Sequence, residues 1–330
     1  MDSNNITIGL CGDVMIGRSL DEIISQKGYK YPWGNTLSLF EKTDLNIINL
    51  ETTLTKSDKK TCKVFNFKAQ PDKIQTLSEA RITLVNIANN HILDYSEEGL
   101  IETIMVLKKA GIKYVGAGIN AQEAAEMEVV KKNGIQIGIL GFTDNEPGWK
   151  AGQKKAGTNY IDVENTDDRK KCLENIKSSK KQVDILIVSI HWGYNMIEEP
   201  PPHFIEFAHE MIDAGADIIH GHSAHIFQGI EIYKSKLILY DTGDFIDDYV
   251  VDPGLRNDLS FFFQIEIDKS GIKKLKLIPI KIHNYQANIA EGIDLEWSMK
   301  RIKNLSQKFK TKLKDNGEVL LSFETKALQV

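Results

Sequence analysis

The sequence has little of what membrane, secreted and nucleic-acid-binding proteins need. No apolar run reaches the roughly 18 residues of a membrane-spanning helix, so we expect no membrane segment. Only 3 cysteines occur, widely spaced and without a Cys-x-x-Cys pair, which predicts reduced thiols and no disulfide framework. The 46 acidic residues outnumber the 41 lysines and arginines, giving a net charge of −5, so we expect no nucleic-acid partner.

A secretion signal is also missing from the start of the sequence. The first residues, MDSNN, include no basic segment followed by an apolar stretch, and they run directly into Ile6–Cys11. Together with the scarce cysteines, this start predicts a cytoplasmic protein. The 42% of hydrophobic and 26% of charged residues are ordinary for a folded globular chain, which excludes a disordered or fibrous one.

Two common kinds of active-site loop are absent as well. No serine or cysteine lies in a Gly-x-Ser-x-Gly turn, which argues against a nucleophilic hydrolase of that type. After the first predicted strand, Gly9-Leu-Cys-Gly12 precedes an acid and lacks the later glycines and the lysine of phosphate-binding loops. Nucleotide binding of the Walker or dinucleotide type is therefore not expected.

What the sequence does contain is an alternation of β-branched runs with segments of helical periodicity. The predicted strands of the first two thirds are Ile6–Cys11, Leu45–Asn49, Ile82–Ile87, Lys113–Gly116, Ile135–Gly141, Ile185–Ile190 and Ile218–His220. Apolar residues recur at helical spacing in Gly99–Ala110, Arg169–Ser178 and Phe204–Ala214. This order is typical of βαβ units and a largely parallel sheet. The later runs Leu237–Tyr240, Phe261–Ile267 and Lys274–His283, with a turn signal at Lys269-Ser-Gly271, predict antiparallel strands.

The C-terminal part predicts one helix. Within residues 296–314, apolar residues recur at Met299, Ile302, Leu305, Phe309 and Leu313, as on one face of an amphipathic helix. A membrane-surface helix is the alternative, but the negative net charge favours packing on the rest of the chain. No repeat or long linker divides the sequence. We therefore expect residues 1–285 to form one domain and residues 286–330 a helical appendage packed on it.

Polar residues gather where the predicted strands end. Asp13, Glu51, the Asn89-Asn90-His91 run, His191, and the cluster His220, His222 and His225 each follow a different strand. The carboxyl ends of parallel strands meet at one edge of a sheet, where ligands bind. Imidazole, carboxylate and amide ligands together suit Zn, Fe or Mn. Each residue alone has an ordinary alternative, such as a helix cap for Asp13, and we interpret His203, His209 and His283 as structural or surface residues.

These motifs, in this order, resemble the poly-γ-glutamate capsule biosynthesis protein CapA family of the calcineurin-like metallophosphatase superfamily. The segments that carry the resemblance are residues 12–18, 49–53, 89–99, 191–193, 214–217, 221–228 and 240–245. The resemblance covers residues 6–285. It implies an α/β fold, a metallophosphatase-like α/β/β/α sandwich with mixed sheets.

The resemblance also implies a centre for two divalent ions, Mn, Zn or Fe. Its implied metal ligands are Asp13, Glu51, Asn90, His191, His222 and His225. His91 resembles the catalytic residue beside the asparagine ligand, and Asp94 would orient its ring. The candidate substrate-binding residues are Arg18, Asn145 and Trp192, with Lys150 and Arg256 as further cations for an anionic substrate.

Two positions depart from the superfamily pattern. Met15 stands where a histidine is usual, and Glu51 stands where an aspartate is usual. One metal position is therefore expected to be weak, empty or differently occupied. Whether His220 or His222 is the ligand stays open.

Three functions are compatible with this site. The first is a metal-dependent hydrolase acting on a phosphoester or a peptide-like amide, such as a γ-glutamyl peptide. The second uses the same centre, with His91 as a base, in a peptide epimerase. The third is a non-catalytic subunit that assists polyglutamate synthesis or export. No oligomeric state is predicted.

Overall fold

Two β-sheets form the centre of the protein, whose computed structural model describes residues 5–321. The strands of the first sheet follow the order β19-β20-β17-β16-β1-β2-β5-β6, with β15 beside β1 and β18 beside β17. Their bounds are β1 (Ile6–Val14), β2 (Leu45–Leu50), β5 (Leu84–Asn86), β6 (Lys113–Val115), β15 (Asp244–Ile246), β16 (Leu259–Asp268), β17 (Gly271–His283), β18 (Gln286–Ile289), β19 (Lys312–Leu313) and β20 (Glu318–Leu320).

The first sheet is mixed. Strands β1, β2, β5 and β6 run parallel, whereas β16 lies antiparallel to β1 and pairs with β17 in a hairpin. The turn at Lys269-Ser-Gly271 connects the two hairpin strands. The predicted antiparallel strands are therefore confirmed for the runs Phe261–Ile267 and Lys274–His283. The run Leu237–Tyr240 differs, because it pairs parallel with Ile218–His222 in the second sheet and is antiparallel only to Ile230–Tyr233.

The second sheet has the order β13-β14-β12-β11-β9-β8. Its strands are β8 (Glu128–Lys132), β9 (Ile135–Thr143), β11 (Ile185–His191), β12 (Ile218–His222), β13 (Ile230–Tyr233) and β14 (Lys236–Leu239). The four inner strands are parallel, and the edge strands β8 and β13 are antiparallel to their neighbours.

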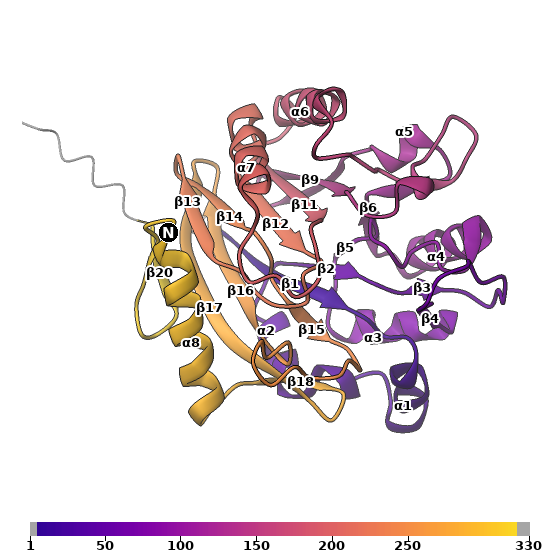
Figure 1. Cartoon of the computed structure of the whole chain (residues 1–330), viewed down its shortest axis with the longest axis horizontal. Coiled ribbons are helices and arrows are strands. Elements are labelled where there is room, and N and C mark those ends of the chain that lie inside the picture. The colour runs from indigo at the N-terminus through magenta and orange to yellow at the C-terminus, as the bar shows by residue number, and fades with distance from the viewer. Residues whose placement is uncertain (1–4, 322–330) are drawn as a thin grey trace, which may run out of the picture.

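Most helices lie outside the two sheets (Figure 1), whereas the last helix, Gly292–Gln307, packs against the apolar cluster between the sheets. Their bounds are α1 (Ser19–Lys27), α2 (Leu37–Phe40), α3 (Ile74–Glu79), α4 (Ser96–Ala110), α5 (Ala121–Ala124), α6 (Thr166–Lys180), α7 (Pro202–Ala214) and α8 (Gly292–Gln307). Two short pairs complete the strands: β3 (Thr53–Leu54) with β4 (Lys68–Ala69), and β7 (Ala117–Gly118) with β10 (Gly157–Thr158).

The buried apolar side chains of the described residues form three clusters, which define the layers. One joins α1, α3 and α4 to the outer face of the first sheet. The second lies between the sheets, where Ile8 and Ile47 share a cluster with Ile137 and Ile187. The third joins α6 and α7 to the outer face of the second sheet. This arrangement is the expected α/β/β/α sandwich with mixed sheets.

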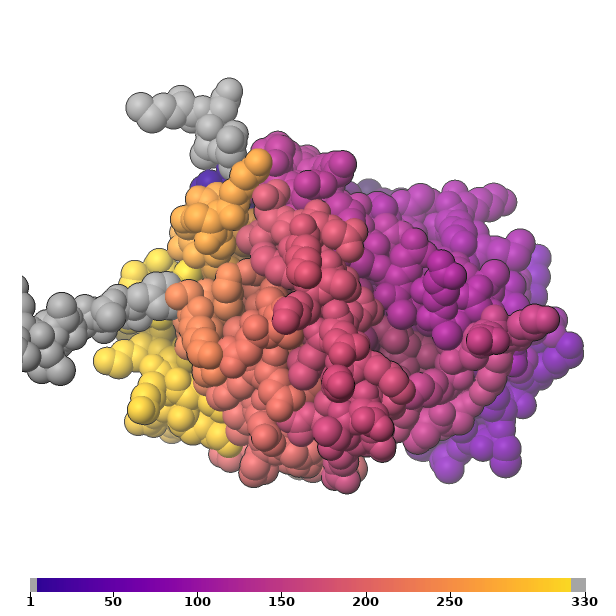
Figure 2. Space-filling view, turned by 90° about the horizontal axis from the view of Figure 1, so that it is seen from above, coloured from indigo at the N-terminus to yellow at the C-terminus, as the bar shows by residue number. Residues whose placement is uncertain are grey.

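The described chain starts and ends on the same side of the molecule, where Figure 1 marks the N-terminal end beside β20. Figure 2 shows the C-terminal segment, in yellow, at one end and the early segments, in violet, at the other. Within residues 5–321, none of the helices combines the length and the apolar composition that crossing a membrane requires.

The C-terminal helix exists, but its predicted bounds, residues 296 and 314, are both wrong. Helix α8 begins at Gly292 and ends at Gln307, and Leu313 lies in strand β19 instead. Lys310 adopts a left-handed backbone (φ 58°), which a continuing α-helix does not allow. Phe309 stacks on Tyr240, with ring centroids 4.9 Å apart. The helical spacing of Phe309 and Leu313 therefore reflects two separate packing contacts.

The carboxyl ends of strands from both sheets come together at one end of the sandwich. The sequence predicted a single sheet edge, whereas β1, β2 and β5 belong to the first sheet and β11 and β12 to the second. A contact across the sheets joins them: His220 Nε2 lies 2.9 Å from the carbonyl oxygen of Cys11. The polar strand ends thus face one another across the sandwich.

Candidate metal centre

The first sheet contributes buried carboxylates. Asp13, near the end of β1, is in register with Asn49 on β2 and with Asp244 on β15. Glu51 directly follows β2, and its side chain is completely buried. Asn49 Nδ2 donates a hydrogen bond to Asp13 Oδ1 (2.7 Å). Strand pairing therefore gathers three acidic side chains at one buried point.

The second sheet contributes two imidazoles. His191 and His222 are the last residues of β11 and β12 and are directly paired in register. Their Nδ1 atoms lie 2.9 Å apart, and each lies 3.7 Å from Asp13 Oδ1. The three residues offer ligand atoms within 4.8 Å of one another, which suits a metal ion. Asn90 Oδ1 lies 3.0 Å from His191 Nε2 and adds an amide oxygen beside this group.

A second group of possible ligands shares Asp13. It also contains Glu51, His225 and Asp244, again with one ligand atom each within 4.8 Å. His225 Nδ1 lies 2.9 Å from Asp244 Oδ1 and 3.6 Å from Asp13 Oδ2. Its loop is held by Asp241 Oδ2, which accepts a hydrogen bond from the backbone N–H of Ala224 (2.7 Å).

Several oxygens of this second group are buried without a partner. Among the described residues, Asp13 Oδ2, Glu51 Oε1 and Asp244 Oδ2 accept no hydrogen bond. A buried carboxylate oxygen without a partner costs several kcal/mol by desolvation, at the order-of-magnitude level, unless a cation or donor satisfies it. The residues present therefore fit bound divalent cations.

Burial and mutual repulsion perturb the acidic groups. Burial raises the pKa of Asp13 to about 6. Burial, and to a smaller extent the negative charge of Asp13, raises the pKa of Glu51 well above its usual range. Burial, followed by the charge of Asp247, does the same to the pKa of Asp244. Groups that resist ionisation in the free protein are those that a bound cation would ionise and stabilise.

The histidines divide into two kinds. Burial holds the pKa of His191 and of His222 well below the usual histidine value, so both imidazoles are neutral at pH 7, as metal binding requires. Burial also lowers the pKa of His225, but the nearby Glu51 and Asp13 carboxylates outweigh it and raise that pKa above the usual value. The neighbouring carboxylates therefore favour the charged form of the His225 imidazole.

His222, rather than His220, faces the centre. Ser189 Oγ lies 3.0 Å from His222 Nε2, which leaves His222 Nδ1 directed at Asp13. Both ring nitrogens of His220 are engaged elsewhere, with Ser189 Oγ at 3.2 Å and the Cys11 carbonyl at 2.9 Å. These contacts favour His222 over His220 as the ligand.

His91 and Asp94 form a pair at the edge of the centre. His91 Nδ1 lies 2.5 Å from Asp94 Oδ2, which also accepts the backbone N–H of Phe67 (2.6 Å). The Phe67 ring stacks on the imidazole with centroids 3.6 Å apart. His91 Nε2 lies 3.8 Å from Glu51 Oε1. The ring is thus fixed with one nitrogen on Asp94 and the other toward the centre.

A cavity of about 610 Å³ opens onto this centre. Its wall includes Asn90, His91 and His225, together with two cations, Arg18 and Lys63. The remaining wall is largely aromatic and apolar and is made by Val64, Phe65, Phe67, Tyr249 and Val250, with Glu146, Asn195 and Asp248. The cavity therefore gives a substrate access to the buried ligand groups.

The structure brings only one of the three predicted substrate-binding residues to this cavity. Arg18 lines it, with Nε 3.4 Å from Asp248. Asn145 lines a neighbouring hollow of about 190 Å³. Trp192 is buried, packs edge-on against Phe204, and donates from Nε1 to the Tyr240 carbonyl (2.9 Å).

The two further cations that the sequence singled out are engaged in ion pairs elsewhere. Lys150 pairs with Asp168 at 2.7 Å, and Arg256 binds Asp258 and Asp294, each at 2.7 Å.

Sequence reasoning missed Asp244 and Lys63. Asp244 lies within the quoted segment 240–245, but its strand has only three residues, too short for a periodic signal. A carboxylate after the run Leu237–Tyr240 was the available signal. Lys63 lies in a loop without periodicity, and its ammonium reaches Asp94 at 3.0 Å. Nothing in the local sequence predicts that contact.

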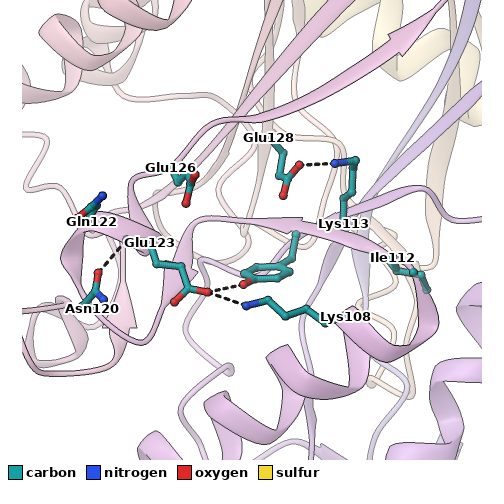
Figure 3. Close-up of a pocket in the computed structure, with 10 residues that line it drawn as sticks. Lys108, Ile112, Lys113, Asn120, Gln122, Glu123, Glu126 and Glu128 are labelled. Carbon is teal, nitrogen blue, oxygen red and sulfur yellow. Dashed lines mark hydrogen bonds and ion pairs between the residues drawn. The ribbon is translucent and has the colours of Figure 1, made fainter.

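Another cavity lies between α4, β6 and β8, and none of its lining residues belongs to the metal centre. It measures about 690 Å³, and Figure 3 shows that charged side chains line it. Most of these charges already pair: Lys108 with Glu123 at 3.1 Å and Lys113 with Glu128 at 2.5 Å. Tyr114 also donates to Glu123 (2.6 Å). We assign no ligand to this cavity.

Comparison with known proteins places the chain in a family. The family model described as "Bacterial capsule synthesis protein PGA_cap" matches residues 7–249. The capsule biosynthesis protein CapA of Bacillus anthracis is 32% identical over 288 residues, which cover 85% of this chain and 68% of that protein. A "Probable polyglutamine synthesis accessory protein" of Mycobacterium tuberculosis is 31% identical over 92% of both chains.

A solved structure shares the fold. A hypothetical protein from Thermus thermophilus superposes with a TM-score of 0.51 and 13% identity, covering 84% of this chain and all of that one. At this identity the likeness concerns the fold alone. Because the family model spans well over half of the chain and the relatives align over most of it, the protein belongs to the CapA-like family of bacterial capsule synthesis proteins.

Proposed function

We propose that the protein is a metal-dependent hydrolase that cleaves a phosphoester or a peptide-like amide at a centre for two divalent cations. One observation carries the proposal: Asp13, Glu51 and Asp244 each direct a buried carboxylate oxygen without a hydrogen-bond partner, among the described residues, toward a common point. That point lies beside the cavity that His91 and His225 line. A purely structural core does not need such a cluster.

The residues that would hold the cations are those the sequence indicated. Asp13, His191 and His222, with Asn90 beside them, suit one ion. Asp13, Glu51 and His225 suit the other. When bound, a pair of divalent cations supplies Lewis-acid activation of the scissile group and of the attacking water.

His91 moves the proton in this proposal. Asp94 Oδ2 is a carboxylate acceptor, so the imidazole donates from Nδ1 and keeps a free lone pair on Nε2. Burial lowers the pKa of His91 to about 4, although Asp94 opposes this shift, so the ring is neutral at pH 7 and ready to accept a proton. Asp94 stabilises the imidazolium that forms, which can then protonate the leaving group.

Arg18 and Lys63 would receive an anionic part of the substrate. Both line the cavity, and Arg18 has a side chain that is 37% exposed. The Arg18 guanidinium also lies 5.4 Å from the centre of the Phe67 ring and 5.9 Å from that of Tyr249. The names of the relatives connect capsule and polyglutamine synthesis with this family, so a γ-glutamyl peptide is the amide substrate that we propose.

The free Nε2 of His91 also favours a second candidate function. A neutral imidazole held by Asp94 can remove a carbon-bound proton, as a peptide epimerase requires. Solvent deuterium would then enter the peptide without cleavage.

The name of the mycobacterial relative supports a third function, an accessory subunit without catalysis. Such a subunit would bind metal and show neither turnover nor exchange.

A substrate screen separates these functions. Manganese- or zinc-loaded protein is incubated in deuterated buffer with an aryl phosphate and with γ-glutamyl peptides. We expect cleavage of one class and no cleavage by protein treated with a chelator. Deuterium uptake without cleavage would identify the epimerase, and metal binding without either reaction would identify the accessory subunit.

A further inference from the structure

The inference concerns a ligand of the metal centre on which the proposed function rests. The first strand supplies one ligand only, because Met15, two residues after Asp13, points away from the centre. Its side chain is completely buried in the outer cluster of the first sheet. Its sulfur also lies 3.2 Å from the backbone nitrogen of Gly17, which donates to it. The group around Asp13 therefore needs a ligand from elsewhere.

Strand β15 brings Asp244 to that place. Its parallel pairing with β1 sets Asp244 in register with Asp13. Two backbone hydrogen bonds fix the pairing: Asp13 N–H donates to the Gly243 carbonyl (3.0 Å) and Met15 N–H to the Ile246 carbonyl (2.8 Å). The approach is so close that a Cβ on Gly12 would lie 1.8 Å from the Gly243 oxygen. Asp244 is consequently held beside Asp13 by the backbone itself.

The Asp244 carboxylate has one oxygen engaged and one without a partner. Oδ1 lies 2.9 Å from His225 Nδ1. Oδ2 is buried, and it accepts no hydrogen bond from the described residues. It shares this condition with Asp13 Oδ2 and Glu51 Oε1, the other two carboxylates of the same group.

We propose that Asp244 is a direct metal ligand in an oxygen-rich position formed with Asp13, Glu51 and His225, and that it takes the role that Met15 does not fill. Three carboxylates and one imidazole surround this position. The other position has one shared carboxylate, Asp13, and the imidazoles of His191 and His222. The two positions thus differ in their ligand chemistry.

This difference predicts a preference for different cations. Carboxylate oxygens suit hard ions such as Mn²⁺ and Mg²⁺, whereas imidazole nitrogens suit Zn²⁺ and Fe²⁺. The oxygen-rich position should take manganese, and the nitrogen-rich position should take zinc. A protein offered both metals should hold one of each.

The test compares Asp244→Asn with wild type and with Asp248→Asn. Asp248 is a matched control two residues after the end of β15, outside both ligand groups, where it accepts the backbone N–H of Ser19 (3.1 Å). The three proteins are freed of metal with a chelator, dialysed against equal concentrations of Zn²⁺ and Mn²⁺, and analysed for metal content. Wild type and Asp248→Asn should hold one zinc and one manganese, and Asp244→Asn should keep zinc and bind manganese at least about 10-fold more weakly.

Manganese alone gives a second readout. Two manganese ions in one centre interact magnetically, so wild type should show a coupled EPR spectrum and Asp244→Asn an isolated Mn²⁺ signal. Full manganese content and a coupled spectrum in Asp244→Asn would overturn the proposal. So would a wild type that binds fewer than two ions in total, or one that binds two zinc ions when zinc and manganese are both present.

A third measurement decides the case if Asp244→Asn does not fold. Anomalous diffraction at the manganese and zinc edges from wild-type crystals should place manganese against the Asp244 carboxylate. Manganese located away from Asp244 would contradict the inference. Full manganese content in Asp244→Asn would contradict the ligand assignment and leave the hydrolase proposal standing, because none of these readouts involves turnover. The hydrolase proposal can in turn fail while the ligand assignment stands.

Discussion

At the scale of single residues, the pair of Asn90 and His91 shows how neighbours in the chain can serve different roles. Asn90 directs its amide oxygen to His191 Nε2 (3.0 Å), inside the nitrogen-rich group. His91 turns its Nδ1 to Asp94 and stacks on Phe67. We therefore expect metal binding from Asn90 and proton transfer from His91.

Replacing His91 by asparagine should remove proton transfer and keep the metals. Positioned acid–base groups contribute about 10²- to 10⁴-fold in rate, or about 3–5 kcal/mol of barrier. His91→Asn should lower kcat by that factor with unchanged metal content, measured by elemental analysis of the same sample. Loss of metal in His91→Asn would reverse the assignment, because His91 would then be a ligand.

Replacing Glu51 by glutamine should lower metal content. Glu51 Oε1 lies 3.9 Å from His191 Nε2 and 3.8 Å from His91 Nε2, and it accepts no hydrogen bond from the described residues. The neutral amide removes one negative charge and keeps the shape. We expect about one ion per chain in Glu51→Gln after loading that gives two in wild type, because Asp13, His191 and His222 still form the other ligand group. Two tightly held ions in Glu51→Gln would exclude Glu51 as a ligand.

At the scale of elements, the close pairing of β1 with β15 is what positions the centre. Gly12 has no Cβ, and that allows the Gly243 carbonyl to approach and Asp13 and Asp244 to align. The same strand, β1, also pairs with β2 and so aligns Asp13 with Asn49. The metal ligands thus depend on backbone packing that a single methyl group can disturb.

Gly12→Ala should therefore damage stability and metal binding together. Its new Cβ would meet the Gly243 oxygen at 1.8 Å, and forcing a methyl group into a packed interior costs about 1–3 kcal/mol. Chemical denaturation should show that loss, and metal titration should show weaker binding. Gly148→Ala is the control, because its added Cβ meets no atom within 4 Å. Equal behaviour of the two variants would contradict the role given to β15.

The elements also show what a sequence can predict. Periodicity identified α4, α6 and α7 to within three residues at each end, because each buries one apolar stripe in a sheet face. It failed at the end of α8, where the left-handed backbone of Lys310 stops the helix although the apolar spacing continues. Backbone geometry of this kind has no signature in hydrophobic spacing.

The sequence also predicted part of the candidate site, because its residues lie near the ends of recognisable strands. Asp13, His191 and His222 lie at the ends of strands, and Glu51 and Asn90 lie just after strands, so strand prediction alone brings them to one end of the fold. The division of these strands between two sheets came from long-range pairing that no local pattern records. The position of Asp244 beside Asp13 likewise depends on long-range pairing, here between β15 and β1.

At the scale of the whole molecule, the buried carboxylates should control how stability depends on pH when metal is absent. Burial raises the pKa of Asp241 to about 8 and those of Glu51 and Asp244 well above their usual range. Groups with raised folded-state pKa values stabilise the fold at low pH, and this contribution is lost as pH rises through those values. His191 and His222 oppose this trend only below about pH 6.5, where they would be protonated in the unfolded chain.

Metal-free protein should consequently lose stability between pH 6.5 and about 8, by up to about 1.4 kcal/mol per pH unit for each such group. Bound cations favour the ionised carboxylates, so the loaded protein should not show this loss. Thermal unfolding with chelator and with manganese across this range checks both slopes. Identical slopes with and without metal would show that the acids do not bind it.

The central claim is that two cations at this centre support hydrolysis. The most direct measurement is a titration of chelated protein with manganese, following cleavage of the best substrate from the screen. Activity should be absent at first, rise with added metal and level off at two ions per chain. Hydrolysis that is undiminished in the metal-free protein, or two bound ions without hydrolysis of any phosphoester or γ-glutamyl peptide, would contradict the claim.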